Sequence, residues 1–268
     1  MLRYRVLSAI VMLPLTIGVL MLGGWWYLAA IGLVLTLAAW EFVGLMRKGD
    51  HSPWLAGTLA LVWISLIDLE RPSWELFTPG LTVVLLASLV WSMRRFNQGE
   101  PDPTTNWSLT LAGGLYLGWV GANFLRLRGL DNGLYWSVIA FGSTWLADSG
   151  AYFIGRAWGR HKLASKLSPG KTWEGIIGGL VVGALSTTLL AALFGLGVWH
   201  GFTLGVLIAT LSPIGDLGVS MIKRQVGAKD SSKLIPGHGG FFDRIDSLLI
   251  SVTIGTYYVL WIVQRGDF

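Results

Sequence analysis

Nine apolar runs separated by short polar segments make up most of this chain. Most of them have the ~20 residues that a helix needs to cross a hydrocarbon core about 30 Å thick. The pattern predicts an all-α, polytopic integral membrane protein with about nine transmembrane helices. The short connections near 69–77 and 199–200 leave eight or ten spans as alternatives. The runs lie at roughly 6–22, 25–46, 53–69, 77–93, 108–125, 134–155, 174–198, 200–222 and 245–264.

The composition agrees with a membrane protein. Hydrophobic residues make up 53% of the chain and charged residues 13%, with a mean hydropathy of +0.60. A soluble protein of this length would have too little polar surface to stay dispersed. The 15 tryptophans suit the two interfaces of a bilayer, where amphipathic rings accumulate. The absence of cysteine excludes disulfides, thiolate metal sites and cysteine nucleophiles.

The distribution of Lys and Arg predicts the orientation in the membrane. With the N-terminus in the cytoplasm, all but four of the 20 Lys and Arg residues fall in cytoplasmic segments, where membrane proteins carry an excess of cations. The two longest polar loops, 156–173 and 223–243, then both open on the cytoplasm. The isoelectric point near 9.6 is thus explained by topology, and no nucleic-acid partner is expected. The four cations outside are Arg71, Arg126, Arg128 and Arg265.

The two halves of the chain differ in polar content. The first five runs carry few ionisable groups, Glu41 being the main one, and the last four carry nearly all of the polar clusters. Inverted-repeat transporters usually place broken helices in corresponding positions of both halves. Nothing in 1–130 mirrors 140–246, so a localised site is favoured over an ion carrier.

Three aspartates in the last two runs have a spacing that suggests metal binding. Asp216 is followed by Ser220 and Lys223 at i+4 and i+7, which places all three on one helical face. Asp243 and Asp246 share a face if the last helix begins at Asp243. A hard divalent cation held by several carboxylates would balance their charge. The structural alternative is that Asp216 pairs with a lysine and Asp243 caps the last helix.

The segment 148–175 supplies basic and small polar residues. Asp148, Tyr152 and Arg156 fall at i, i+4 and i+8 of the sixth run, and the loop HKLASKLSPGKTWEG follows. Lysines among Ser, Gly and Thr suit phosphate binding, because ammonium groups, hydroxyls and backbone N–H groups direct positive charge at the oxygens. The SPGKT sequence is not a P-loop, because that motif needs a glycine where Ser165 stands. The alternative is a basic loop that touches anionic lipid heads.

Local features of the polar loops allow three smaller predictions. Ser168 and Pro169 resemble a helix start, with Glu174 near the first turn. His238 lies between glycines, which let the backbone come close to a ligand, so ligand contact is favoured over a role as general base. Two series of small residues at a spacing of four predict close helix packing. These series are Gly175/Gly179/Gly183 and Ala147/Ala151/Gly155.

The run from Ser220 to Asp246 reads S-x-x-K-R-x4-K-D-x-S-x2-I-P-G-H-G-G-x2-D-R-x-D. It resembles the signature of the phosphatidate cytidylyltransferase family, also called CDP-diacylglycerol synthases. A second block, from D-S-G-A-Y at Asp148 through G-R-x2-G-R-H-K-L to S-P-x-K-T-W-E-G, is similar to the same family over 148–175, and the polytopic layout agrees over the remaining length. The sequence departs from the pattern at Gly170, where a second lysine is common, which affects only the number of loop cations.

The resemblance implies a nucleotidyltransferase of phospholipid biosynthesis that converts CTP and phosphatidic acid into CDP-diacylglycerol and pyrophosphate. It implies Mg²⁺, with a second metal or a monovalent cation as an option. It also implies a homodimer in the cytoplasmic (inner) membrane, with the active site facing the cytoplasm. The helices of 1–130 would then form a scaffold with dimer contacts, and 131–268 would form the catalytic region. A CDP-alcohol phosphotransferase, a second alternative, is disfavoured because its D-G-x2-A-R motif is missing and because Gly240, Asp243 and Asp246 are spaced by three, where that family expects four.

The resemblance also assigns roles to residues. A lipid phosphate is already largely ionised near neutral pH, since its second pKa is ~6, so charge neutralisation and positioning are needed rather than a protein nucleophile. The residues expected to hold metal and to act in catalysis are Asp216, Asp243 and Asp246. The catalytic cations are Lys223 and Arg244. The residues expected to bind substrate are Asp148, Lys166, Ser168, Lys171, Ser220, Arg224, Lys229 and His238.

The distribution of cations leads to a test of topology. An alkaline phosphatase fused to the C-terminus should be active in cells, because this enzyme matures only outside the reducing cytoplasm. The matched fusion within the loop 156–173 should be inactive. Strong fluorescence of a cytoplasm-dependent reporter at the C-terminus would contradict the nine-span arrangement.

Overall fold

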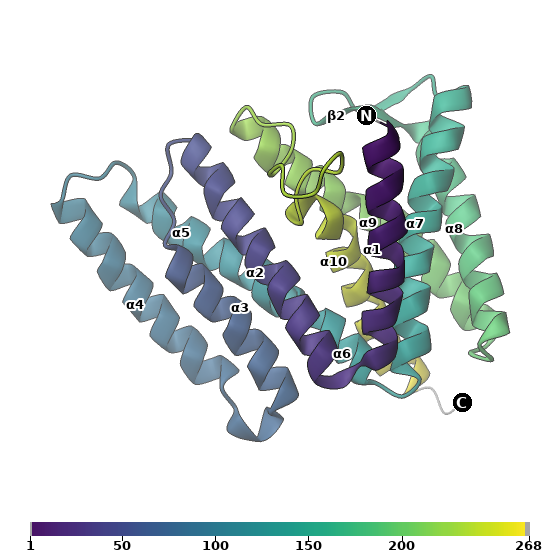
Figure 1. Ribbon diagram of the computed structural model, residues 1–268, viewed down its shortest axis with the longest axis horizontal. Helices are drawn as coiled ribbons and strands as arrows, with labels where there is room; N and C mark the ends of the chain where they lie inside the picture. Colours follow the sequence, from purple (N-terminus) through teal and green to yellow (C-terminus); the bar gives the residue numbers. More distant parts are fainter. Residues whose placement is uncertain (1, 266–268) are drawn as a thin grey trace. The chain divides into compact units, whose positions relative to one another are not determined.

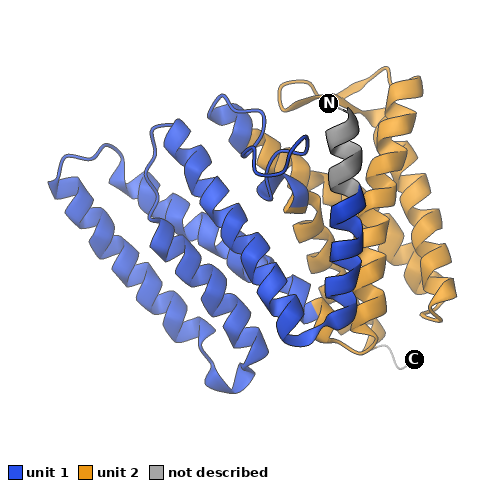
Figure 2. Cartoon of the chain, in the orientation of Figure 1, with its two compact units in different colours: residues 1–126, 222–244 blue, residues 127–221, 245–268 orange. Residues whose placement is uncertain are grey.

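The computed structural model describes residues 2–265, with side chains described from residue 10 onward, and the chain forms two compact units. Unit 1 comprises residues 1–126 and 222–244, and unit 2 comprises residues 127–221 and 245–268 (Figure 2). The side chains of Arg3 and Arg5 and the C-terminal residues 266–268, which bear on the predicted topology, lie outside the described residues.

Unit 1 is built around α3, which contacts α2, α4, α5 and the π-helix that follows α5 (Figure 1). The backbone of this π-helix comes so close to α3 that a Cβ on Gly118 would lie 2.7 Å from the carbonyl oxygen of Leu61. Glycine is therefore required at this contact. The elements are α1 (Leu2–Leu22), α2 (Gly24–Lys48), α3 (Leu55–Glu70), a 3-10 turn (Pro72–Trp74), α4 (Phe77–Asn97), α5 (Pro103–Gly114), the π-helix (Leu115–Val120) and the start of α6 (Asn123–Gly129).

Unit 2 holds a pair of long helices joined by a short antiparallel hairpin. The hairpin pairs Lys162 with Thr172 and Ala164 with Ser168, and it connects α7 to α8. Helices α9 and α10 each have residues in both units. The elements are α7 (Gly133–Trp158), β1 (Lys162–Ala164), β2 (Ser168–Thr172), α8 (Trp173–Leu193), α9 (Val198–Gln225), α10 (Phe242–Tyr258) and a closing π-helix (Val259–Val263).

Helices α7 and α8 lie side by side along a seam of small residues (Figure 1). A Cβ on Gly179 would lie 2.9 Å from the carbonyl oxygen of Ala147 and 3.0 Å from the Cβ of Ala151. A Cβ on Gly183 would lie 3.0 Å from that of Ala147. The predicted packing role of the small-residue series is confirmed, because these helices approach closely only where side chains are absent or small.

The predicted all-α class is confirmed for the described residues, with the hairpin β1–β2 as an addition. Helices occupy all nine predicted apolar runs, although the fifth run is divided among α5, the π-helix and α6. In this part of unit 1, the hydroxyls of Thr58 and Thr110 donate to backbone carbonyl oxygens, and the contact of Thr58 with the carbonyl of Thr110 links α3 to α5. The prediction that a helix starts at Ser168 is wrong, because Ser168–Thr172 form β2 and α8 begins at Trp173.

The chain is an integral membrane protein. Among the described residues, five helical segments are long and apolar enough to cross a bilayer: α2, α4, α8, α9 and α10 with its closing π-helix. Their outward side chains are apolar as well, since Leu185, Leu189 and Leu193 of α8 are 61–70% exposed. Such surface is unfavourable in water at about 25 cal/mol per Å² but is matched by hydrocarbon.

The seam between α7 and α8 predicts a selective effect on stability. Gly179→Ala should destabilise the protein by about 1–3 kcal/mol, because the new methyl group meets a backbone carbonyl that cannot move freely. Gly44→Ala is the matched control, since a Cβ there would meet nothing within 4 Å and alanine favours a helix. The melting temperature in detergent should fall for the first variant and not for the second. Equal melting temperatures would show that the seam is not tightly packed.

Candidate active site

The signature segment 226–241 joins α9 to α10 through tight turns. The N–H of His238 donates to the carbonyl of Ile235 at 3.0 Å, and the N–H of Ile235 donates to the carbonyl of Gly239 at 2.8 Å. Gly237 has a φ of 78°. A type II turn with Pro236 as its second residue requires such a positive φ at its third residue, which is Gly237. The P-G-H-G-G sequence therefore specifies a local fold that brings the chain back to the start of α10.

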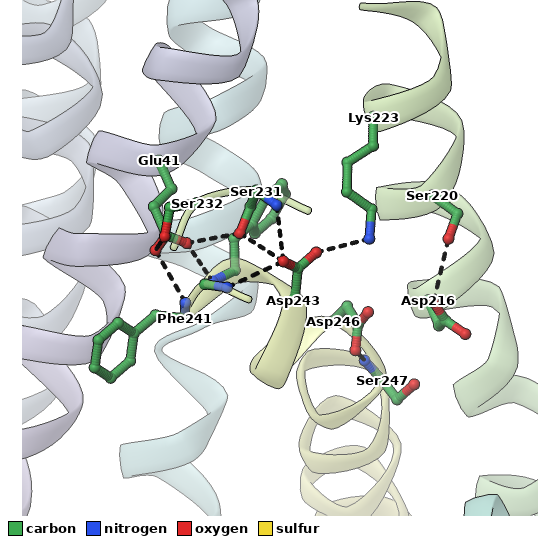
Figure 3. A network of polar contacts seen from close by, with 12 residues as sticks. Glu41, Asp216, Ser220, Lys223, Ser231, Ser232, Phe241, Asp243, Asp246 and Ser247 are labelled. Atoms are coloured by element: carbon green, nitrogen blue, oxygen red, sulfur yellow. Dashed lines mark hydrogen bonds and ion pairs between the residues drawn. The ribbon is translucent and has the colours of Figure 1, made fainter. Parts of the chain in front are cut away.

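Asp243 organises this segment from the first turn of α10. Its Oδ2 accepts from the N–H of Ser231 at 2.8 Å, the hydroxyl of Ser231 at 2.9 Å and the N–H of Gly240 at 3.1 Å (Figure 3). Its Oδ1 forms an ion pair with Nζ of Lys223 at 2.7 Å. Both side chains are buried. Removing one member of a buried pair typically costs about 3–5 kcal/mol, because it leaves an uncompensated charge.

Glu41 is a polar residue of this site to which sequence reasoning gave no role. Its carboxylate comes from α2, is 2% exposed, and lies within hydrogen-bond distance of four donors. The hydroxyls of Ser232 and Ser231 lie at 2.6 and 3.0 Å, and the N–H groups of Phe241 and Phe242 lie at 3.1 and 2.8 Å (Figure 3). The signal in the sequence was its isolation, since it is the main ionisable residue of the first five apolar runs. The sequence contains no indication of which residues Glu41 would contact, since its partners lie about 190 to 200 residues away along the chain.

In unit 2 the predicted residues Lys171 and Asp216 form an ion pair. Nζ of Lys171, on β2, lies 2.6 Å from Oδ2 of Asp216, on α9. The hydroxyl of Ser220 lies 3.3 Å from the other carboxylate oxygen, which agrees with the shared helical face that the i+4 spacing predicts. Lys223, which follows on the same helix, pairs with Asp243. The contacts of the structural alternative are therefore present: Asp216 pairs with a lysine, and Asp243 accepts an N–H at the start of the last helix.

Asp246 lies where α9 and α10 approach each other in unit 2. A Cβ on Gly215 would overlap the carbonyl oxygen of Asp246, so the two backbones are in contact beside Asp216. The Asp246 side chain is buried, and its Oδ1 accepts from the N–H of Ser247 at 2.6 Å (Figure 3). The carboxylates of Asp216 and Asp246 thus come from neighbouring positions at a helix crossing.

The hairpin ahead of α8 is held by Glu174 and Thr172. The Glu174 carboxylate accepts from the N–H groups of Arg160 and His161 at 3.1–3.3 Å and contacts Nδ1 of His161 at 2.6 Å. Thr172 is the N-cap of α8, since its hydroxyl accepts from the N–H of Gly175 at 3.1 Å. This cap explains why the helix starts after β2 and not at Ser168.

The remaining predicted residues lie mainly on the surface. Ser168 and His238 are half-buried, and the other predicted residues of this group are exposed. Flexible cations on the surface can reach an anionic ligand without a cost of burial. The exposed members are Asp148 on α7, Lys166 in the hairpin, Arg224 at the end of α9, Lys229 in the signature segment and Arg244 on α10.

The donor chemistry suits a hard cation at some of the aspartates. Within the described part of the chain, no group of three or more His, Asp or Glu side chains is placed to hold one metal ion. Asp216 and Asp246 nevertheless offer the carboxylate oxygens that Mg²⁺ prefers, at one helix crossing. Both oxygens of Asp243, like both oxygens of Asp216, already contact protein donors. The metal assignment stays a prediction.

Comparison with known proteins agrees with the resemblance in the polar loops. The sequence model of the cytidylyltransferase family matches residues 3–263. The phosphatidate cytidylyltransferase of Pseudomonas aeruginosa is 36% identical, with 99% of both chains covered. That of Haemophilus influenzae is 35% identical over 98% of this chain and 100% of its own length, and that of Synechocystis sp. is 32% identical over 96% of both. The chain therefore belongs to the cytidylyltransferase family of nucleotidyltransferases.

Proposed function

We propose that this protein is a phosphatidate cytidylyltransferase. A phosphate oxygen of phosphatidic acid attacks the α-phosphorus of CTP, the bond from that phosphorus to the bridging oxygen of the β-phosphate breaks, and pyrophosphate leaves. CDP-diacylglycerol is the product. The observation that carries the proposal is the likeness to relatives of that name along almost the whole of both chains. The buried polar contacts that join Asp243, in the first turn of α10, to the signature segment support it.

The protein's own residues supply charge and position. Lys171 and Lys223 each lie beside an aspartate, which fixes the ammonium group before substrate arrives. Arg224, Lys229 and Arg244 are exposed cations at or near the signature segment. Together these groups neutralise the phosphates of CTP and of the lipid and stabilise the pyrophosphate leaving group. The attacking lipid phosphate is already ionised, so no protein base takes its proton.

We further propose that Mg²⁺ binds to Asp216 and Asp246, with Asp243 as a third ligand and a second metal or a monovalent cation as an addition. A bound divalent cation would polarise the phosphoryl oxygens and offset their charge. The hard oxygen ligands at the crossing of α9 and α10 support this assignment. Binding at Asp216 or Asp243 requires the carboxylate oxygens to exchange some of their present donors.

The proposed setting is the cytoplasmic membrane of a bacterium, because the organisms of the related proteins are bacteria. We propose nine membrane spans, a cytoplasmic N-terminus and a site that opens on the cytoplasm, where CTP is made. The excess of Lys and Arg in the segments on that side supports this orientation. We also propose that the protein forms a homodimer, because the resemblance to the family implies one.

The reaction can be tested directly with purified protein. Label from [α-³²P]CTP should enter a chloroform-soluble product only when phosphatidic acid is present. Asp216→Asn and Asp246→Asn should each lower turnover by at least about 100-fold, because a lost carboxylate weakens the hold on a cation that supplies several kcal/mol. Asp230→Asn, at an exposed carboxylate of the signature segment, should leave turnover unchanged.

Size-exclusion profiles in detergent show whether the Asn variants remain folded. Failure of label to enter lipid would overturn the proposed reaction. Near wild-type turnover of Asp216→Asn or Asp246→Asn at saturating Mg²⁺ would remove that residue from the metal site.

The two buried or half-buried lysines should affect different kinetic constants. Lys171→Met should mainly raise the KM for CTP, and Lys223→Met should mainly lower kcat. Each effect should be roughly 10- to 150-fold, since a charge-assisted hydrogen bond contributes ~1.5–3 kcal/mol. Steady-state rates at fixed lipid mole fraction, with each substrate varied in turn, separate the two constants.

Lys233→Met is the matched control for both lysines, because Lys233 is exposed in the signature segment and has no assigned role. Activities must be expressed per folded protein, since Lys223→Met also leaves the buried Asp243 without its cation. If Lys171→Met leaves the KM for CTP unchanged, the loop 156–173 does not bind CTP through this lysine, and the alternative of a basic loop that contacts anionic lipid heads is favoured.

A further inference from the structure

Glu41 is a buried carboxylate whose four bonding partners are all neutral. Among the described residues it forms no ion pair, and it is balanced by two serine hydroxyls and two backbone N–H groups. A buried charge is costly unless its hydrogen bonds are satisfied, and an uncharged side chain would fill the same space at lower cost. The negative charge at this position of α2 therefore calls for an explanation other than packing.

The partners of Glu41 show what the charge holds in place. Phe241 and Phe242 stand at the start of α10, where the first N–H groups of a helix have no partner within the helix. A carboxylate at this end also interacts favourably with the helix dipole. Ser231 and Ser232 belong to the signature segment. One side chain of α2 thus fastens both the segment and the start of α10.

Ser231 links Glu41 to Asp243. Its hydroxyl lies 3.0 Å from Oε2 of Glu41 and 2.9 Å from Oδ2 of Asp243, so its single hydrogen is shared between the two carboxylates. Asp243 in turn holds the ammonium group of Lys223. Gly240 packs against the same atoms, because a Cβ there would overlap both the Ser231 hydroxyl oxygen and Oε2 of Glu41. The chain of contacts from Glu41 to Lys223 is therefore continuous and tightly packed (Figure 3).

We propose that Glu41 is a positioning residue for cytidylyl transfer. It acts through Ser231 to orient the Asp243 carboxylate and, through that carboxylate, the Lys223 ammonium group. The inference rests on the proposed function for the role of Lys223, and it adds a residue of the first half of the chain to the catalytic arrangement. Glu41 itself touches neither substrate.

The matched substitution is Glu41→Gln, which keeps the shape but replaces one acceptor oxygen by an NH₂ group that faces donors. We expect kcat per folded protein to fall roughly 10- to 100-fold, with the KM for CTP changed by less than about twofold, because charge-assisted bonds that orient a catalytic cation are lost. Glu75→Gln, the same change at an exposed glutamate, should have no effect. Glu41→Asp keeps the charge and should recover part of kcat.

Ser231→Ala tests the route by which Glu41 acts and is a milder change should Glu41→Gln fold poorly. It should lower kcat alone, and the double variant with Glu41→Gln should be no slower than the slower single variant, since the two residues act in series. Independent multiplication of the two effects, or an unchanged kcat in both single variants, would overturn the proposal. A purely structural role would lower the yield or the melting temperature and leave kcat per folded protein at the wild-type value.

A readout without catalysis separates this inference from the proposed function. Trypsin cuts after lysine, and Lys229 and Lys233 are exposed in the segment that Glu41 fastens. Glu41→Gln should speed cleavage at these sites several-fold relative to Glu75→Gln. An inactive wild-type protein would refute the proposed reaction. Unchanged cleavage in Glu41→Gln would overturn the anchoring by Glu41, whatever the activity.

Discussion

A carboxylate buried at the end of a membrane helix must find its hydrogen-bond donors within the protein, because hydrocarbon offers none. Glu41 takes its donors from the serines of the signature segment and from the N–H groups at the start of α10. Asp243 takes its donors from Ser231, the N–H of Gly240 and Lys223, and the Ser231 hydroxyl contacts both carboxylates. The segment between α9 and α10 owes its shape to this constraint. Its glycines and serines are the residue types that can come close enough to donate.

The same physical constraint governs the cations. A lysine ammonium group near a membrane is costly when it lacks a partner, and a cation free to move would be poorly placed for phosphate transfer. Lys171 and Lys223 each lie 2.6–2.7 Å from an aspartate oxygen. Under the proposed function these pairs keep the cations oriented until a substrate phosphate competes for them. The exposed cations nearby add charge without a cost of burial.

Close backbone contacts provide the rigid frame on which these side chains depend. The glycine seam between α7 and α8, and the contact of Gly215 with the backbone of α10, leave no room for added side chains. Helices packed this closely hold their polar residues at fixed positions, since a small shift would create overlap at the backbone. In unit 2, the contact between Gly215 and the backbone of Asp246 fixes the backbone positions from which the Asp216 and Asp246 side chains extend. The frame is thus part of the site.

The sequence by itself determined the features that depend on local periodicity. Apolar runs located the helices, the i+4 spacing placed Ser220 on the same helical face as Asp216, and small residues at a spacing of four predicted the α7–α8 seam. These succeed because a helix repeats every 3.6 residues wherever it occurs. The family signature was recognisable because its residues lie in one continuous segment of the sequence.

Only the tertiary structure decided which charged groups meet. Helical spacing placed Lys223 and Asp216 on one face, yet Lys223 pairs with Asp243, and Asp216 pairs with Lys171 from β2. Glu41 meets the signature segment across about 190 residues of chain, and no local pattern encodes such a contact. Pairings between elements depend on helix crossings and on the path of the loops. These are set by the packing of the whole unit, which residue spacing alone does not contain.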